Sequence, residues 1–382
     1  MNILVTGAKG MMGTALCNNL KNIRDGKNKT RPALNIEEIY EYDLDSTPAE
    51  LDEYCRKANF VFNLAGVNRP KNPEAFQKGN VDFTREVLES LRAARNDCPV
   101  MLASSVQAVC LNPYGESKRQ AEELVWEHGK ETGARVLIYR FPNLFGKWNR
   151  PNYNSVVATF CDHIARDLPI RVDDPATELT MAYIDDVVEA LLLGLLGREE
   201  RKNDFCVVKP EFRVTLQQIT DWLYRFQSQS RTLVVPEMPP ESFQKRLYAT
   251  YLSYLPMEKA AYMLKSKADE RGSFTEVLKP ENGGQFSINV LKPGVTKGRH
   301  WHNTKWEIFI VVSGQGLIRQ RKIGSNEIAV FEVNGEKPEA VYMLPGYTHE
   351  IQNRSETEEL ILVIWANEAF EPEHPDTFFE EV

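Results

Sequence analysis

The sequence predicts a doubly wound α/β domain with a parallel sheet, followed by an all-β domain that is a barrel or a sandwich. Over roughly the first 140 residues, short apolar runs alternate with helical patterns, which is typical of βαβ units on a parallel sheet. The last third instead alternates apolar and polar residues in short runs between turns, as barrels and sandwiches do. At 382 residues, the chain also exceeds the size that one hydrophobic core usually reaches.

Composition and charge exclude several classes of protein. The 42% hydrophobic and 26% charged shares are ordinary for a globular protein, and no stretch approaches the ~20 apolar residues of a membrane span. A net charge of −8 provides no general basic surface for nucleic acid or an anionic membrane. The start MNILVTGAKG lacks a secretory-signal pattern, and the six cysteines form no short pairing motif. We therefore expect a cytoplasmic protein with neither a nucleic-acid nor a membrane partner.

The first domain is expected to alternate strands and helices and then to continue into a smaller lobe. Strands are predicted at residues 2–6, 60–64, 100–104 and 135–140, and helices at 13–20, 81–93 and 115–128. Beyond residue 140, helical stretches among proline-rich loops suit a smaller lobe folded against the first part. These stretches are 154–165, 184–196 and 216–226.

The domain boundary is predicted near residue 260. Between residues 235 and 272 the pattern loosens into a mixture of proline, charge and glycine. The α/β domain with its smaller lobe is therefore placed at residues 1–260, and the β domain at residues 261–382. The alternating runs of the β domain are FSINVL, IFIVVSG, GLIRQRK, IAVFEV, AVYML and LILVIWA.

A glycine-rich turn follows the first predicted strand. Gly7, Gly10 and Gly13 open directly into a helix, so a pyrophosphate could approach the backbone at the helix N-terminus. A plain glycine turn without a ligand is the alternative. The position at the first strand of a βαβ chain favours a Rossmann-like dinucleotide site.

Three further residues are candidates to bind the same cofactor. Asp43 ends the run IEEIYEYD, where an acid would bind the adenosine ribose hydroxyls, although a solvated loop charge fits the pattern equally well. Leu64 and Ala65 belong to NLAG, where small residues would let a cofactor lie close. A simple strand-to-loop turn is the other interpretation of NLAG.

A tyrosine and a lysine form a candidate catalytic couple. Tyr114 and Lys118 are four apart, so they share one face of a predicted helix. An ammonium close to a phenol favours the phenolate, which makes tyrosine a usable proton donor and acceptor near neutral pH. The pair follows a strand ending in Ser104 and Ser105, within NPYGESK, which distinguishes it from a chance pair.

These motifs, continued by RFPNLFG and YIDDV, resemble the extended short-chain dehydrogenase/reductase family. The resemblance implies that a serine and Tyr114 bond the substrate carbonyl oxygen, that Lys118 holds the cofactor ribose, and that a nicotinamide transfers hydride. It assigns the polarising hydroxyl to Ser105, with Ser104 as the alternative. Only nine positions separate Ser105 from Tyr114, fewer than most members of the family have.

Four polar residues in the smaller lobe are candidates for binding the substrate. Asn143 in PNLFG resembles the start of the substrate lobe in that family. Lys147, Arg150 and Asn154 supply donors suited to a diphosphate, although a solvated basic loop would have the same composition.

The β domain carries a candidate metal site. His300 and His302 are two apart, so both imidazoles project from one face of a strand. Residues 303–305 can form a turn that brings Glu307 back to that face, and His349 follows a second turn, Pro-Gly-Tyr. Three histidines and a carboxylate suit zinc, and also iron, nickel or manganese. The spacing resembles that of the metal-binding cupins, which implies a jelly-roll barrel; a cupin without metal, or histidines satisfied by hydrogen bonds, is the alternative.

The two sites could act on one substrate. A reductase needs a ketone, and the proton on the neighbouring carbon is acidic, especially when a metal polarises the carbonyl. Along its whole length the chain also resembles the bifunctional enzymes of capsular polysaccharide and O-antigen synthesis, on motifs such as PNYNSV, TYLSYLP, DERGSF, GYTH and NEAFEPEHPDT. The resemblance implies a homodimer that converts a UDP-2-acetamido-2,6-dideoxy-L-hexul-4-ose on the route to UDP-N-acetyl-L-fucosamine. A zinc cupin domain would epimerise carbon 3, and the first domain would reduce carbon 4 with NADPH.

Several alternatives stay open at the level of sequence. Asp43 disfavours the extra phosphate of NADPH, so NADH is an alternative cofactor. Lys297, Tyr347 and Glu350 all lie near the metal ligands in sequence, and none is distinguished as the epimerisation base. Two other functions are a reductase with a purely structural metal and a non-catalytic nucleotide sensor.

Overall fold

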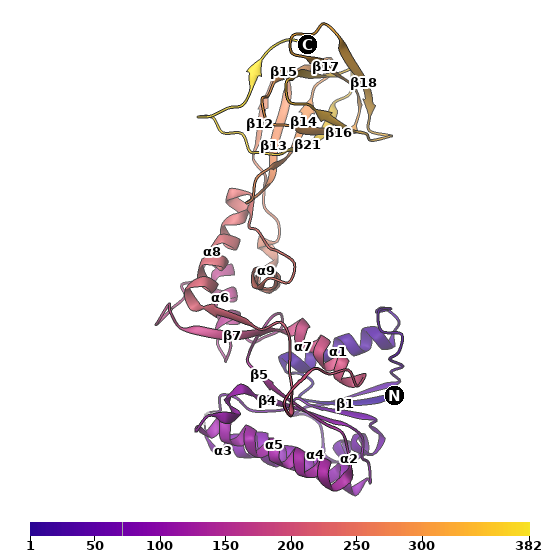
Figure 1. Cartoon of the computed structure of the whole chain (residues 1–382), viewed down its shortest axis with the longest axis vertical. Coiled ribbons are helices and arrows are strands. Elements are labelled where there is room, and N and C mark those ends of the chain that lie inside the picture. The colour runs from indigo at the N-terminus through magenta and orange to yellow at the C-terminus, as the bar shows by residue number, and fades with distance from the viewer. Residues whose placement is uncertain (71) are drawn as a thin grey trace. The chain divides into compact units, whose positions relative to one another are not determined.

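The computed structural model describes residues 1–70 and 72–382, which divide into two compact units (Figure 1). The first unit comprises Met1–Leu223 and Pro239–Pro256, and the second comprises Tyr224–Met238 and Met257–Val382. The chain therefore passes between the units three times. The domain boundary near residue 260 stays a prediction. Among the described helices, none combines the length and the apolar character that crossing a membrane requires.

A seven-stranded sheet forms the centre of the first unit. In spatial order its strands are β2 (Glu38–Tyr42), β1 (Asn2–Thr6), β3 (Phe60–Asn63), β4 (Val100–Ser105), β5 (Val136–Phe141), β9 (Phe205–Cys206) and β8 (Arg201–Lys202). Pairing is parallel from β2 to β9, and β8 alone runs antiparallel to its neighbour. The carboxyl ends of β1 to β5 therefore meet at one edge, where doubly wound sheets bind their ligands.

Helices cover both faces of this sheet (Figure 1). The apolar side chains of α1 (Met11–Arg24) and α7 (Ile184–Leu195) pack on one face. The opposite face packs against α2 (Pro48–Lys57), α4 (Phe83–Ala93) and α5 (Pro113–Thr132). Short helical segments complete the layer: α3 (Glu74–Phe76), a π-helical turn at Gln77–Asp82 and a 3-10 turn at Val106–Val109. This arrangement confirms the predicted doubly wound α/β fold.

The smaller lobe is built around a three-stranded sheet. Its strands, in order, are β10 (Phe212–Thr215), β7 (Glu178–Tyr183) and β6 (Asn143–Phe145). Its helices are α6 (Val156–Ala165), α9 (Phe243–Ser253) and the first part of α8 (Leu216–Thr232), which continues into the second unit from Tyr224. The helix predicted from residue 154 begins at Val156 instead, because the Ser155 side chain caps it by accepting the Ala158 N–H at 3.3 Å. The last predicted helix also extends to Thr232 rather than residue 226.

The second unit consists of two packed sheets that together make a barrel. The larger sheet contains β11 (Val234–Val235), β13 (Gly272–Pro280), β14 (Gln285–Leu291), β21 (Leu360–Ala366), β16 (Glu307–Ser313) and β19 (Ala340–Met343), with β12 (Ser266–Asp269) beside β13. The smaller sheet contains β18 (Ile328–Asn334), β17 (Gln315–Lys322), β20 (Tyr347–Asn353), β15 (Thr296–Trp301) and β22 (Phe378–Phe379). Apart from the β11–β13 pair, the described pairings are antiparallel, and apolar residues such as Ile318, Ile351 and Leu362 fill the interior. The predicted all-β domain is confirmed.

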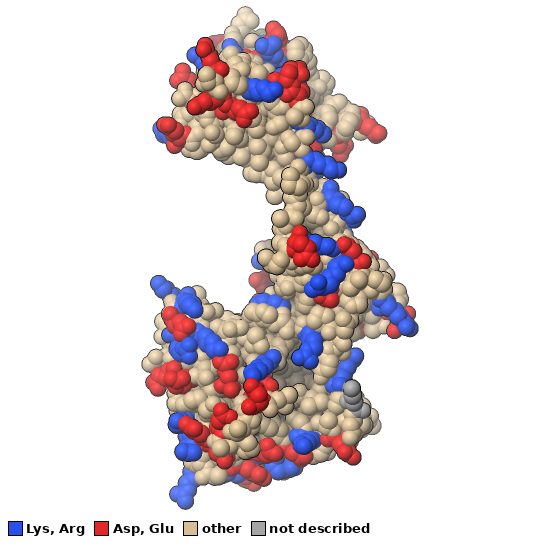
Figure 2. Space-filling view, turned by 180° about the vertical axis from the view of Figure 1, so that it is seen from behind, with Lys and Arg blue, Asp and Glu red and all other residues tan. Residues whose placement is uncertain are grey.

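Acidic and basic side chains are intermixed on the surface. Figure 2 shows both kinds interspersed over the visible face of each unit. On that face, this distribution agrees with a chain of net charge −8 that has no general basic footprint. Recognition of a charged ligand therefore depends on local groups.

Candidate reductase site and metal centre

The glycine turn packs tightly against the start of α1. Gly7 has a φ of +66°, and a Cβ there would lie 2.8 Å from the backbone of Ala65. A Cβ on Gly13 would lie 2.2 Å from the carbonyl oxygen of Gly7, so only glycine lets the helix approach the turn this closely. Gly10 precedes the helix and offers no side-chain cap to its N–H groups. No side chain of the cap residue therefore occupies the main-chain N–H groups at the helix N-terminus, which fits the approach of a dinucleotide pyrophosphate.

The other predicted cofactor residues gather at the same edge of the sheet. Asp43 follows β2, and its carboxylate accepts the N–H of Lys9 at 2.7 Å and the N–H of Leu44 at 2.8 Å. Leu64 and Ala65 follow β3 and are half-buried, and Ala65 donates its N–H to the Thr6 hydroxyl at 3.3 Å. The structure therefore places the glycine turn, Asp43 and the NLAG segment around one region, as the sequence predicted.

Lys118 is buried beside the predicted cofactor site. Its side chain is 7% exposed, and its ammonium donates to the carbonyl oxygen of Ala103 at 2.9 Å. A Cβ on Gly66 would come within 2.9 Å of this ammonium, so the end of the lysine side chain would have to shift to admit one. Desolvation lowers the pKa of Lys118 to about 8, although the carboxylate of Glu122 opposes the shift.

Tyr114 lies one helical turn before Lys118, and the two side chains are neighbours. The ammonium is 5.9 Å from the centre of the Tyr114 ring. Burial nevertheless raises the pKa of Tyr114, and a hydrogen bond with the Ser105 side chain only partly opposes this. The expected stabilisation of the phenolate by Lys118 is not the dominant effect, because the ammonium is directed to the Ala103 carbonyl.

The two candidate serines lie on opposite faces of β4. Ser105 is hydrogen-bonded to Tyr114, and its hydroxyl also accepts the N–H of Gln107 at 3.1 Å. Ser104 instead donates its hydroxyl to the carboxylate of Glu122 on α5. This geometry favours Ser105 as the hydroxyl that faces a substrate.

Glu122 and Arg140 form a buried pair that the sequence did not reveal. Glu122 is 3% exposed, and Arg140 donates to its two oxygens at 2.9 and 2.6 Å. The Arg140 guanidinium also stacks over the Phe205 ring at 3.7 Å. Glu122 is four residues beyond Lys118 on α5, a spacing that could have indicated a shared helix face. This pair supports β4 from behind the site.

The predicted substrate residues have separate partners. Asn143 is exposed, and its amide donates to the carbonyl oxygen of Thr180 at 3.3 Å. Lys147 forms an ion pair with Asp185 at 2.6 Å, and its role as a donor to a diphosphate stays a prediction. The remaining two side chains are the exposed Arg150, whose guanidinium lies 5.8 Å from the Tyr153 ring, and the half-buried Asn154.

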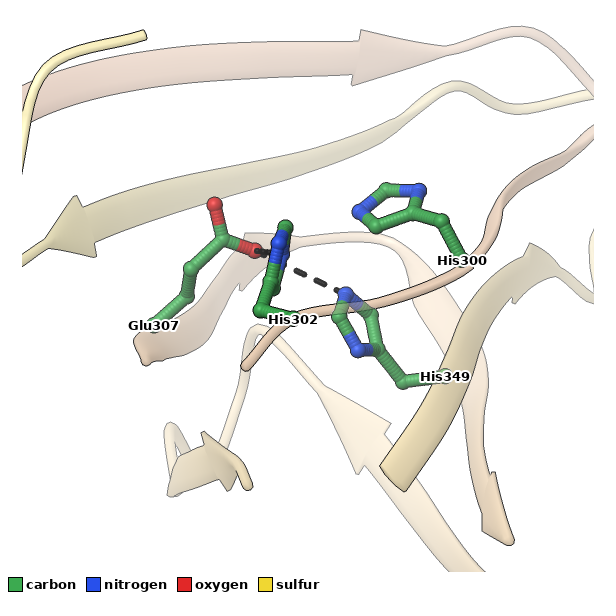
Figure 3. A group of neighbouring side chains, drawn as sticks. All are labelled: His300, His302, Glu307 and His349. Atoms are coloured by element: carbon green, nitrogen blue, oxygen red, sulfur yellow. Dashed lines mark ion pairs between the residues drawn. The ribbon is translucent and has the colours of Figure 1, made fainter. Parts of the chain in front are cut away.

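The four predicted metal ligands come together inside the second unit. His300 on β15 lies opposite His349 on β20 in the strand register. His302 follows β15, Glu307 begins β16, and the residues between them form the expected turn. One nitrogen or oxygen from each of the four side chains lies within 4.8 Å of the others. Figure 3 shows the four side chains grouped together. The Glu307 carboxylate is 3.6 Å from His349 Nε2 and 3.8 Å from His302 Nε2.

The chemistry of these donors fits a divalent metal ion. His302 Nε2 and both ring nitrogens of His349 are buried and, within the described structure, lack a hydrogen-bond partner. Burial lowers the pKa of His300 to about 4, reinforced by the neighbouring His349 and His302, so the ring is a neutral ligand at pH 7. Burial alone would raise the pKa of Glu307, but the two imidazoles beside it hold that pKa well below its usual value. Neutral imidazoles and an ionised carboxylate are the protonation states that metal binding requires.

Comparison with known proteins matches the two parts of the chain to different families. A family model described as the NAD dependent epimerase/dehydratase family matches residues 3–207, and a model of the polysaccharide biosynthesis C-terminal domain matches residues 267–378. The crystal structure of the capsular polysaccharide assembling protein CapF from Staphylococcus aureus matches with 43% identity and a TM-score of 0.91, covering 100% of both chains. The chain belongs to the family of CapF-like capsular polysaccharide proteins.

Two further relatives have names that refer to nucleotide sugars. A protein of Pseudomonas aeruginosa named UDP-2-acetamido-2,6-beta-L-arabino-hexul-4-ose reductase is 39% identical over 99% of this chain and 98% of its own length. The UDP-glucuronic acid 4-epimerase of Bacillus cereus in complex with NAD covers 66% of this chain and 98% of its own, with a TM-score of 0.51. At 18% identity, that second likeness supports only the fold.

Proposed function

We propose that the chain is a bifunctional nucleotide-sugar enzyme for capsule or O-antigen polysaccharide. Residues 1–260 reduce the 4-keto group of a UDP-2-acetamido-2,6-dideoxy-hexulose, and residues 261–382 epimerise its carbon 3, in a cytoplasmic homodimer that forms UDP-N-acetyl-L-fucosamine. The observation that carries the reductase is the grouping of Ser105, Tyr114 and Lys118 beside the glycine turn. Support for the substrate comes from the 39% identity to the Pseudomonas reductase.

In the reductase, each polar group has one task. The hydroxyls of Ser105 and Tyr114 bind the ketone oxygen, and Tyr114 donates the proton that this oxygen needs as it becomes an alcohol. A bound nicotinamide supplies the hydride. The Lys118 ammonium keeps two N–H groups beyond the one donated to Ala103, and these are suited to ribose hydroxyls.

In the second unit, the proposed metal is zinc held by His300, His302, Glu307 and His349. A bound zinc ion would act as a Lewis acid on a neighbouring carbonyl. Among the three candidate bases, the Glu350 carboxylate is already paired with Arg319 at 2.8 Å and Arg299 at 3.2 Å. Lys297 and Tyr347 therefore remain the candidates for removing the proton.

Lys297 has an environment suited to a neutral amine. Its ammonium donates to the Asn289 side chain at 2.9 Å and to the carbonyl oxygen of Val290 at 3.0 Å. Desolvation lowers the pKa of Lys297, which increases the share of the neutral amine at pH 7.

Because reduction of the ketone removes the acidity of the carbon beside it, epimerisation must precede reduction in a productive sequence.

The two adjacent serines provide a matched test of the reductase site. Ser105→Ala is expected to lower kcat about 10²-fold, because it removes a hydroxyl that stabilises the reacting oxygen. Ser104→Ala should keep kcat and instead lower the free energy of unfolding by about 1–3 kcal/mol, because Glu122 loses a buried donor. Steady-state kinetics and urea unfolding of both variants separate the two roles. A loss of kcat in Ser104→Ala alone would contradict the assignment.

The choice between NADPH and NADH can be tested at Asp43. The resemblance implies NADPH. Asp43, however, accepts the main-chain N–H of Lys9, and the Lys9 ammonium is paired with Asp45 at 2.5 Å rather than with Asp43. A ribose hydroxyl can donate to the Asp43 carboxylate, whereas a 2′-phosphate is repelled by it. We therefore expect NADH to bind at least about tenfold more tightly than NADPH, a difference of about 1.4 kcal/mol.

Isothermal titration of both cofactors, without the sugar, measures this preference directly. Asp43→Asn should weaken NADH and strengthen NADPH, because it removes the charge and keeps the size of the side chain. Asp25→Asn, at the end of α1, is the control for the loss of one surface carboxylate. Tighter binding of NADPH by the wild type would show that another group, such as Lys9, neutralises the phosphate.

A further inference from the structure

The C-terminal residues 376–381, called the C-terminal strap below, lie against β15, the strand that carries His300 and leads directly into His302. The strap includes β22, which pairs antiparallel with β15. In this register Phe379 is opposite His300, and Phe378 is opposite Trp301. The rings of Trp301 and Phe378 are 4.9 Å apart, so side chains as well as backbone hold the strap in place.

Asp376, the first residue of the strap, determines which ring nitrogen of His302 carries the proton. The Nδ1 atom of His302 is hydrogen-bonded to the main-chain carbonyl oxygen of Asp376, and the Thr377 hydroxyl is 3.4 Å from the same nitrogen. A carbonyl oxygen can only accept, so Nδ1 must carry the proton. The lone pair of the neutral ring is then on Nε2, the atom that lies 3.8 Å from the Glu307 carboxylate in the metal cluster.

The carboxylate of Asp376 also closes the turn between His302 and Glu307. One oxygen accepts the N–H of Asn303 at 2.9 Å, and the other accepts the N–H groups of Thr304 at 2.8 Å and Lys305 at 3.0 Å. Burial alone would raise the pKa of Asp376, but these backbone donors hold it well below its usual value, so the group is ionised. This is the turn that returns Glu307 to the face of the two histidines.

Other contacts hold the strap independently of the Asp376 side chain. Arg321 pairs with Glu380 at 2.8 Å, and Arg299 pairs with Glu381 at 3.2 Å. The Thr348 hydroxyl donates to the carbonyl oxygen of Glu380. A change confined to the Asp376 carboxylate therefore leaves the strap attached.

We propose that the C-terminal strap is part of the metal centre, with Asp376 as a positioning residue. Its carbonyl fixes the tautomer of His302, and its carboxylate sets the turn that brings His302 and Glu307 to one ion. The inference rests on the proposed metal centre and is independent of whether that centre catalyses epimerisation. Asp376 contacts His302 although the two residues are 74 positions apart in the sequence.

Two variants of the full-length protein test the strap. Asp376→Asn should weaken metal binding about 10–100-fold, the usual effect of removing a group that orients a ligand. Deletion of residues 376–382 should weaken it further, because the acceptor for His302 Nδ1 is then also lost. Glu373→Gln is the matched control, since Glu373 is an exposed carboxylate in the same tail. Zinc affinity is measured by competition with a chromophoric chelator.

A purely structural role for Asp376 is separated by spectroscopy and by unfolding without metal. With cobalt(II) in place of zinc, the visible absorption of Asp376→Asn should differ from that of the wild type and of Glu373→Gln, because the ligand geometry changes. Equal affinity and equal cobalt spectra in all variants would overturn the proposal, as would a lower melting temperature of the metal-free Asp376→Asn protein with unchanged metal binding. A wild type that binds neither zinc nor cobalt would overturn the metal centre itself.

Discussion

Tyr114→Phe is expected to lower kcat for reduction of the keto sugar by about 10²–10⁴-fold while cofactor binding stays unchanged. The substitution removes only the hydroxyl that donates the proton. The ring remains, and with it the packing against Phe76, whose ring centre is 5.7 Å away. Oxidation of the nicotinamide cofactor with the UDP-keto sugar measures kcat, and calorimetric titration measures cofactor affinity.

The control for Tyr114→Phe is the same substitution at Tyr262, whose side chain is 47% exposed. Tyr262→Phe should have the kcat of the wild type. If Tyr114→Phe also reduced the sugar at the wild-type rate, another group would have to supply the proton. Loss of cofactor binding together with kcat would instead indicate damage to the fold around α5.

His300→Ala is expected to weaken zinc binding more than about 100-fold and to abolish exchange of the proton on carbon 3. The cluster loses one of four donors, an effect larger than the about 10–100-fold produced by removing a supporting group. The reductase site lies in the other compact unit, so reduction of a sugar already epimerised at carbon 3 should continue. Metal content by mass spectrometry and product NMR measure the two effects.

His374→Ala is the matched control, because His374 is an exposed histidine in the C-terminal tail. This variant should retain both zinc and exchange. Retention of full exchange by a metal-free His300→Ala protein would assign the chemistry to another part of the chain. Loss of reduction in His300→Ala, with the epimerised sugar supplied, would contradict the separation of the two activities.

Local patterns were sufficient to predict the fold class, the set of metal ligands and the glycine turn. Period and turn signals distinguished the parallel α/β part from the β part, because each depends on residues close in sequence. The metal ligands could also be predicted, since His300 and His302 share a strand face and only a short turn separates them from Glu307. The glycine turn was similarly local.

Interactions between distant residues could not be predicted in this way. The choice between Ser104 and Ser105 depends on which face of β4 meets Glu122, and sequence alone does not determine that. The pairing of Lys147 with Asp185 joins residues 38 positions apart, so the sequence pattern did not indicate it. Asp376 gave no signal at all, because its role depends on the pairing of the last strand with β15.

The central claim is that the metal centre acts on the carbon beside the ketone that the reductase later removes. Its most direct test is deuterium incorporation at carbon 3 of a UDP-4-keto-6-deoxy-N-acetylhexosamine, followed by NMR in deuterated water without nicotinamide cofactor. We expect incorporation with zinc-loaded wild type and with zinc-loaded Tyr114→Phe, and none after the metal is stripped. Absence of deuterium at carbon 3 with the zinc-loaded enzyme would contradict it and would leave the metal a structural role only.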